Sequence, residues 1–324
     1  MKKIIVGILF GGKSAEHEIS LLSAKNIFEA IDRERFEPIP IKIEKDGKWE
    51  IKDLSSIPLD VVFPILHGPF GEDGTVQGLL KLADIPFVGS GVLGSAAGMD
   101  KDVMKRLMRD AGIPIGKFLT VKTHEQVPPF AQIEAALGNP FFIKPANMGS
   151  SVGINKVRDE AEYTAALKDA FQYDTKVIIE EFISGREIEC AVLGNETPIA
   201  SVPGEIIPSH DFYSYDAKYL DDKGASLEIP AKLDDQVVKR VQELSIKVFQ
   251  TLCCEGLSRV DFFLKGNGEL VVNEINTMPG FTRISMYPKM WEASGISYTE
   301  LITRLIELAI ERFEKERRLK TSVL

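Results

Sequence analysis

The stretch SRVDFFLKGNGELVVNEIN carries polar side chains at a spacing that could bind a metal ion. The pair Asn267–Gly268 favours a two-residue type I′ turn, which would place Asp261 opposite Glu274 and Arg259 opposite Asn276 on one sheet face. Opposed carboxylates repel each other, and their burial is costly without a cation. The pattern therefore predicts a site for Mg²⁺ or Mn²⁺, which favour carboxylate and amide oxygens; a structural ion pair through Arg259 is the alternative.

A second group of residues has the types that bind phosphate. In IKPANMGSSVG, a strand would deliver Lys144, and Ser150 and Ser151 would offer N–H and hydroxyl donors from a glycine-rich loop. Lys101, which follows GMD, could add a second positive charge. The pattern favours a nucleotide site, although an ordinary glycine–serine loop between strands would look similar.

A third stretch, GILFGGKS at residues 7–14, matches the P-loop pattern G-x-x-x-x-G-K-[ST]. Its variable positions include the apolar run Ile8–Phe10, which is typical of a buried strand rather than a phosphate loop. We therefore expect a strand that turns through two glycines into a helix, with no phosphate role for Lys13. Glu16, beside that turn, could bind a substrate ammonium group. A P-loop NTPase remains the alternative.

The elements that would position these residues fall into three predicted domains. Residues 1–97 alternate buried strands and helices, including a strand in IPFVGS, and predict a parallel sheet covered by helices. Residues 98–185 and 186–324 predict two smaller α+β domains. A long polar segment within the last domain, SHDFYSYDAKYLDDKGAS, is typical of a functional loop.

Composition limits the classes of function. The chain has 324 residues and a net charge of −9, which disfavours nucleic acid as a partner. Three cysteines without a C-x-x-C motif indicate reduced thiols, and no apolar run is long enough for a membrane span. The start MKKIIVGILF resembles a strand more than a signal peptide. We expect a cytoplasmic protein without a membrane partner; a homodimer is possible, although the sequence does not give the oligomeric state.

Six motifs together resemble one enzyme family. GGKSAEHEIS, HGPFGEDGT, FIKPANMGSSVG, EEFISGREIE, DAKYL and GLSRVDFFL…NEINTMPGFT occur in the order and spacing of D-alanine–D-alanine ligases, which are ATP-grasp enzymes. The resemblance covers nearly the whole chain. It implies a three-domain ATP-grasp architecture of the α/β class, in which an N-terminal parallel α/β domain precedes two α+β domains that clasp ATP.

The resemblance also implies a role for individual residues. ATP would be bound by Lys101, Lys144, Ser151, Glu180, Glu181, Phe182, Ile183, Glu187 and Lys218. Two Mg²⁺ (or Mn²⁺) ions would be bound by Asp261, Glu274 and Asn276. The D-alanine substrates would contact Glu16, His67, Arg259, Gly280 and Ser285. Tyr219 would bond with Ser150 and Glu16 to close the polar loop as a lid.

The implied reaction joins two D-alanines for peptidoglycan precursor synthesis. The first D-alanine attacks ATP to give an acyl phosphate, and the second D-alanine attacks the acyl carbon. Arg259 and the N–H of Gly280 resemble the site for the resulting oxyanion. Alternatives are a ligase of the same fold that uses D-lactate or D-serine, and an inactive nucleotide-binding regulator. Tyr219 favours D-alanine over D-lactate, and the complete metal set disfavours the regulator.

Overall fold

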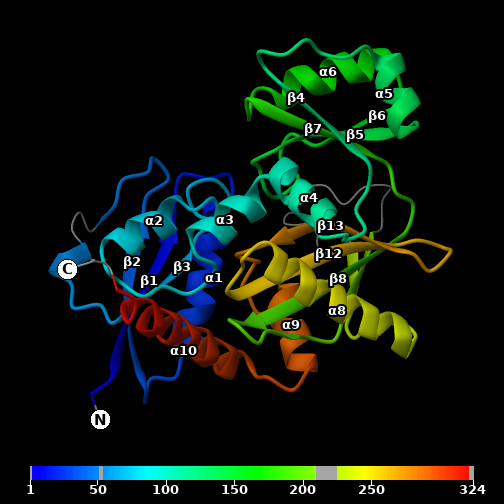
Figure 1. Cartoon of the computed structure of the whole chain (residues 1–324). Coiled ribbons are helices and arrows are strands. Elements are labelled where there is room, and N and C mark those ends of the chain that lie inside the picture. Colours follow the sequence, from blue (N-terminus) through cyan, green and yellow to red (C-terminus); the bar gives the residue numbers. More distant parts are fainter. Residues whose placement is uncertain (1, 51–53, 209–224, 321–324) are drawn as a thin grey trace.

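The computed structural model describes residues 2–50, 54–208 and 225–320 (Figure 1). Three separate sheets organise this part of the chain, and each sheet uses a continuous range of the sequence. The central sheet and its helices form a unit at the top of Figure 1, above the other two sheets. No helix within these ranges is both long and apolar enough to cross a membrane.

The N-terminal sheet is parallel, as the sequence predicts, with the order β2-β1-β3. Its strands are β1 (Ile4–Gly11), β2 (Phe36–Ile43) and β3 (Val61–Ile65). Around it lie α1 (His17–Ala30), the short 3₁₀ turn η1 (Leu54–Ser56), α2 (Thr75–Leu82) and α3 (Val92–Met99). The strand expected in IPFVGS is wrong, because the structure has only an isolated bridge there, between Val62 and Phe87.

Strand β1 settles the P-loop question. Its bounds enclose the first five positions of GILFGGKS, and Ile8 and Leu9 are completely buried. A Cβ atom at Gly7 would lie 2.8 Å from Cδ1 of Ile41, so this glycine packs against β2 and does not form a loop. The P-loop alternative is therefore wrong.

The central sheet is antiparallel, with the order β4-β7-β5-β6. Its strands are β4 (Phe118–Lys122), β5 (Phe141–Pro145), β6 (Asn155–Val157) and β7 (Lys176–Glu181). Helices α5 (Phe130–Leu137) and α6 (Glu160–Ala170) cover one face and share an apolar core with the strands. Helix α4 (Lys101–Asp110) precedes this unit but packs through Met104 and Met108 into the core of the third sheet.

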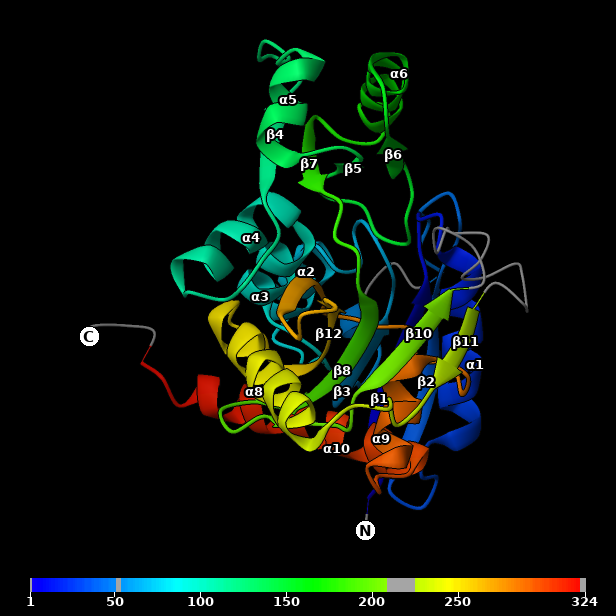
Figure 2. The ribbon, with the colours of Figure 1, turned by 90° about the vertical axis from the view of Figure 1, so that its right-hand side faces the viewer.

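The third sheet has the order β11-β10-β8-β12-β13, with β9 paired to β8. Its strands are β8 (Arg186–Gly194), β9 (Ile199–Ala200), β10 (Gly204–Pro208), β11 (Ala225–Glu228), β12 (Gly256–Leu264) and β13 (Leu270–Asn276). Helix α8 (Asp235–Thr251) covers one face. Helices α9 (Met286–Ala293) and α10 (Tyr298–Arg317) share a core with the other face and with the N-terminal sheet (Figure 2).

The hairpin of β12 and β13 has the predicted register at its functional end, but for a different reason. Asp261 pairs with Glu274 and Arg259 with Asn276, as expected. The predicted two-residue turn is wrong: the N–H of Gly268 bonds to the carbonyl of Lys265, and Lys265 pairs with Glu269 around a three-residue loop. A bulge after Asp261 then shifts the pairing back by one residue.

Candidate active site

Two adjoining cavities lie where the three sheets meet, with volumes of about 430 and about 410 Å³. We call them the first and the second cavity. Their linings have in common Lys101, the loop residues Met148 to Ser150, Ile206 and Glu274. A molecule in one cavity can therefore touch a molecule in the other at this common wall.

The first cavity lies between the central sheet and the third sheet. It brings together most of the residues predicted to bind ATP, including Lys101, Lys144, Ser151 and Glu187, and the run Glu180, Glu181, Phe182 and Ile183. Phe142, Phe263 and Val272 add apolar surface. Cationic, polar and apolar walls in one cavity suit a ligand that has both phosphates and a flat ring.

Glu180 is held by two lysines in this cavity. Its carboxylate lies 2.6 Å from Nζ of Lys144 and 2.6 Å from Nζ of Lys105, and all three side chains are largely buried. Burial alone would raise the pKa of Glu180, but the two ammonium groups lower it to about 2. The carboxylate of Glu180 therefore fixes the position of Lys144.

Lys105 is a cavity residue that the sequence analysis missed. It follows Lys101 by four positions on α4, a spacing that places two side chains on one helix face. That spacing is a signal in the sequence, because Lys101 itself is predicted to contact phosphate.

The loop after β5 has an unusual backbone. Ser150 and Ser151 both have positive φ angles, 50° and 60°, which cost about 1–3 kcal/mol for residues other than glycine. The ammonium of Lys101 donates to the carbonyl of Met148 at 2.6 Å and lies 3.7 Å from Oε2 of Glu274. The strained backbone of Ser150 therefore lies at the common wall of the two cavities.

The second cavity brings together the residues predicted to bind D-alanine. Its lining includes Glu16, His67, Arg259, Gly280 and Ser285, together with Asn276. The hydroxyl of Ser150 donates to Oε1 of Glu16, so the glycine–serine loop contacts the turn after β1. Ser285 directly precedes α9, at the position of a helix cap, but its hydroxyl makes no capping hydrogen bond. That hydroxyl lies 2.8 Å from Oγ1 of Thr282.

Arg259 is the charged centre of the second cavity. Its Nε and Nη2 donate to the two carboxylate oxygens of Asp261, each at 2.7 Å, and Nε lies 3.0 Å from Oε2 of Glu189. Burial would lower the pKa of Arg259, but these carboxylates raise it well above its usual value. Glu189 was missed, although it is two residues from Glu187 in REIEC and so lies on the same strand face.

His67 and Glu72 form a buried polar corner of this cavity. Nδ1 of His67 lies 3.0 Å from the carbonyl of Met278, and its buried Nε2 has no hydrogen-bond partner among the described residues. Burial lowers the pKa of His67, which favours the neutral ring. Burial and the charge of Glu16 raise the pKa of Glu72 to about 8.

The predicted metal ligands share one sheet face, where Asp261 pairs with Glu274 and Asn276 follows two positions later on β13. Glu274 lines both cavities and Asn276 lines the second, whereas Asp261 lines neither within the described ranges. The described residues contain no group of three histidine, cysteine or acidic side chains arranged to bind a metal. The oxygen donors suit Mg²⁺ in kind, provided that Asp261 turns partly away from Arg259.

Two predicted site residues, Lys218 and Tyr219, lie outside the described residues, as does most of the predicted lid.

Comparison with known proteins shows which family this chain resembles. The profile of the D-Ala D-Ala ligase C-terminus matches residues 107–307, and that of the D-Ala D-Ala ligase N-terminus matches residues 5–57 and 50–90.

Curated relatives and solved structures agree with these matches. The chain is 54% identical over 364 aligned positions to the D-alanine–D-alanine ligase of Shouchella clausii. This alignment covers 100% of this chain and 99% of that protein. It is 50% identical over 364 positions to D-alanine–D-alanine ligase A of Salmonella typhimurium, with 100% of both chains covered.

The D-alanine–D-alanine ligase structure from Coxiella burnetii has a TM-score of 0.89 at 38% identity and covers 98% of this chain and 97% of that one. A D-Ala:D-Ser ligase from Enterococcus faecalis has a TM-score of 0.86 at 39% identity, with 95% and 100% covered. The chain belongs to the D-alanine–D-alanine ligase family.

Proposed function

We propose that this chain joins two D-alanine molecules to form D-alanyl-D-alanine, with hydrolysis of ATP to ADP and phosphate, as a step toward peptidoglycan precursors. The observation that carries the proposal is the common wall of the two cavities. A γ-phosphate in the first cavity and a carboxylate in the second can meet beside Lys101, Ser150 and Glu274. Two binding sites with such a junction suit transfer of a phosphoryl group between two substrates.

In the first step, the carboxylate of one D-alanine attacks the γ-phosphate and releases ADP. Glu16 binds the ammonium group of this D-alanine. Lys101 and Lys144 neutralise the phosphates, and Glu180 keeps Lys144 in place through their 2.6 Å contact. Divalent ions bound by Asp261, Glu274 and Asn276 would supply further charge neutralisation when present.

In the second step, the amine of the other D-alanine attacks the acyl carbon and phosphate leaves. The guanidinium of Arg259 and the N–H of Gly280 stabilise the oxyanion that forms. Ser285 binds the carboxylate of the second D-alanine; a Cβ at Gly280 would lie 3.1 Å from its Oγ, so the two residues are close enough to serve one substrate. His67 lies beside the first D-alanine and is neutral.

Lys218 and Tyr219 complete the proposed site as parts of a lid that excludes water from the acyl phosphate.

We also propose domain boundaries near residues 97 and 185, a cytoplasmic location, and a homodimer as the assembled state. At a net charge of −9, we do not expect the protein to have a basic surface that binds nucleic acid.

The test is to measure phosphate release from ATP with D-alanine, D-lactate, D-serine and L-alanine, each offered alone and each paired with D-alanine. We expect turnover with D-alanine alone and dipeptide as the product. Preferred formation of the mixed product with D-lactate or D-serine would instead assign the chain to another substrate class within the family. ATP turnover that does not respond to any amino acid would contradict the proposal.

A further inference from the structure

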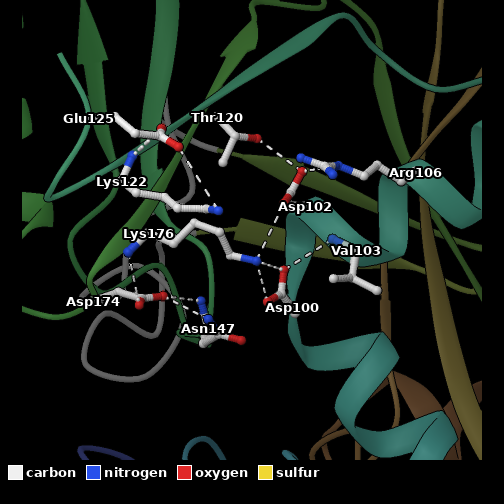
Figure 3. A network of polar contacts seen from close by, with 10 residues as sticks. All are labelled: Asp100, Asp102, Val103, Arg106, Thr120, Lys122, Glu125, Asn147, Asp174 and Lys176. Carbon is white, nitrogen blue, oxygen red and sulfur yellow. Dashed lines mark hydrogen bonds and ion pairs between the residues drawn. The ribbon is translucent and has the colours of Figure 1, made fainter. Parts of the chain in front are cut away.

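Lys176, the first residue of β7, makes contacts that the reaction described above does not explain. Its ammonium lies between two carboxylates at the beginning of α4, at 2.7 and 2.5 Å from the oxygens of Asp100 and 3.4 Å from Oδ2 of Asp102 (Figure 3). The side chains of Lys176, Asp100 and Asp102 are 16%, 18% and 5% exposed, so solvent screens this group only weakly.

The two carboxylates flank Lys101 in the sequence and fix the first turn of α4. Oδ1 of Asp100 caps the helix by accepting from the N–H of Val103 at 3.1 Å. Asp102 accepts from Arg106 at 2.7 Å and from Thr120 on β4 at 3.0 Å. The position of Lys101, which lines both cavities, is therefore set by residues that Lys176 binds.

The same end of β7 also holds the loop that follows β5. Oδ2 of Asp174 accepts from the backbone N–H of Asn147 at 2.8 Å and from its side-chain amide at 2.9 Å (Figure 3). The carbonyl of Lys176 accepts from the N–H of Ala146 at 2.9 Å, and the carbonyl of Ala146 accepts from the N–H of Lys101 at 3.0 Å. One short segment thus supports both Lys101 and the start of the glycine–serine loop.

We propose that Lys176 is a positioning residue for ATP: its ammonium fixes the first turn of α4 and thereby Lys101, whose backbone N–H and ammonium bond to the carbonyls of Ala146 and Met148 in the glycine–serine loop. This inference rests on the proposed function. Removal of the ammonium would leave Asp100 and Asp102 as two like charges near each other, with Arg106 as the remaining cation in contact with Asp102. Their repulsion would move the first turn of α4, and Lys101 with it.

The chain contains a matched control. Lys122 on β4 lies directly opposite Lys176 in the pairing of β4 with β7, and it makes a solvent-exposed ion pair with Glu125 at 4.0 Å. Lys122→Met and Lys176→Met therefore remove the same group from the same pair of strands. Among the described residues, Lys122 makes no hydrogen bond or ion pair with α4 or with the loop for Lys122→Met to remove.

We expect Lys176→Met to raise the KM for ATP by roughly tenfold, because small displacements of binding groups have effects of this size or larger. The KM for D-alanine should change less than the KM for ATP, since among the described residues Glu16 meets this network only indirectly, through the hydroxyl of Ser150 in the glycine–serine loop. Lys122→Met should match wild type, and Lys176→Arg should restore most of the affinity for ATP. A KM for ATP in Lys176→Met equal to that of Lys122→Met would overturn the inference.

Amide hydrogen exchange of the protein without ATP gives a readout that does not depend on catalysis. Lys176→Met should raise exchange in residues 99–104 and 146–151 and leave β12 and β13 unchanged. No change in the two segments, or an equal rise over the whole chain, would contradict a local positioning role. If the wild-type protein lacks ligase activity but Lys176→Met still shows the local rise in exchange, the proposed function fails and the structural link between Lys176 and these segments stands.

Discussion

Two buried carboxylates near the cavities have pKa shifts in opposite directions. Glu180 lies between two lysines, and its pKa falls to about 2, whereas burial and the nearby charge of Glu16 raise the pKa of Glu72 to about 8. The environment therefore makes one an anion and keeps the other protonated at neutral pH. The anion positions a lysine, and the neutral acid adds no charge beside the proposed D-alanine site.

The raised pKa of Glu72 predicts a pH-dependent stability difference. Between its unfolded value of 4.5 and about 8, the unfolded chain is ionised at this group while the folded protein holds the proton. Rising pH then lowers the free energy of unfolding by about 1.4 kcal/mol per unit in that window. Glu72→Gln lacks this loss, so its melting temperature relative to wild type should increase from pH 5 to pH 8. A difference that is constant with pH would contradict the shift.

Lys13 and Lys144 separate the two possible phosphate sites. Lys13 is exposed and lines neither cavity, whereas Lys144 lines the first cavity beside Glu180. We expect Lys13→Ala to keep nearly full activity and Lys144→Ala to lose about a hundredfold or more in kcat/KM for ATP. Steady-state kinetics on both variants checks this. Loss of ATP binding in Lys13→Ala alone would reverse the assignment.

Glu274 tests the proposed metal site. It pairs with Asp261 across the hairpin, so Glu274→Gln removes one of two opposed carboxylates. We expect turnover to be lost and Mg²⁺ or Mn²⁺ binding to weaken, while the melting temperature without metal rises or changes little. Calorimetric titration with Mn²⁺ and thermal unfolding measure the two effects. A large fall in melting temperature without metal would favour a structural ion pair instead.

At the scale of elements, regular strand alternation was the most reliable guide. It predicted that Arg259, Asp261, Glu274 and Asn276 share a face, and the observed pairing agrees. The turn type was not predictable, because residues 266–268 permit two loops that differ by one residue, and the bulge has no clear sequence signal. The register was correct because these two differences cancel.

Other elements depended on tertiary contacts that the sequence does not show. Strand β2 has no clear signal in the sequence, since it contains Pro38 and Pro40; it is an edge strand, where proline is tolerated. Lys105 and Glu189 have functional positions only because α4 packs on the third sheet and β8 lies beside β12. Periodicity predicts on which face of a helix or strand a side chain lies. The residues that the side chain contacts depend on which element packs against that face.

Gly7 gives a test at this scale. A side chain there would enter the contact between β1 and β2, near Ile41 and Leu59. We expect Gly7→Val to lower the free energy of unfolding by about 1–3 kcal/mol through overpacking and to leave the KM for ATP unchanged. Chemical denaturation and kinetics on the folded fraction measure both. A raised KM for ATP with unchanged stability would mean that β1 contributes to nucleotide binding.

At the scale of the whole molecule, one core joins the two ends of the chain. Residues of β1 and β3 share it with α9, α10 and one face of the third sheet. In Figure 1, α10 runs beneath both sheets, and its buried apolar residues belong to this core. The central sheet has an apolar core of its own, separate from the core that the other two sheets share.

The central claim is that a carboxylate in the second cavity attacks a phosphate in the first. D-alanine labelled with ¹⁸O in its carboxylate tests this directly, because an acyl phosphate intermediate gives one carboxylate oxygen to the phosphate that leaves. Mass spectrometry of the products should show one ¹⁸O atom in inorganic phosphate for each dipeptide formed. Dipeptide formation with unlabelled phosphate would contradict the account.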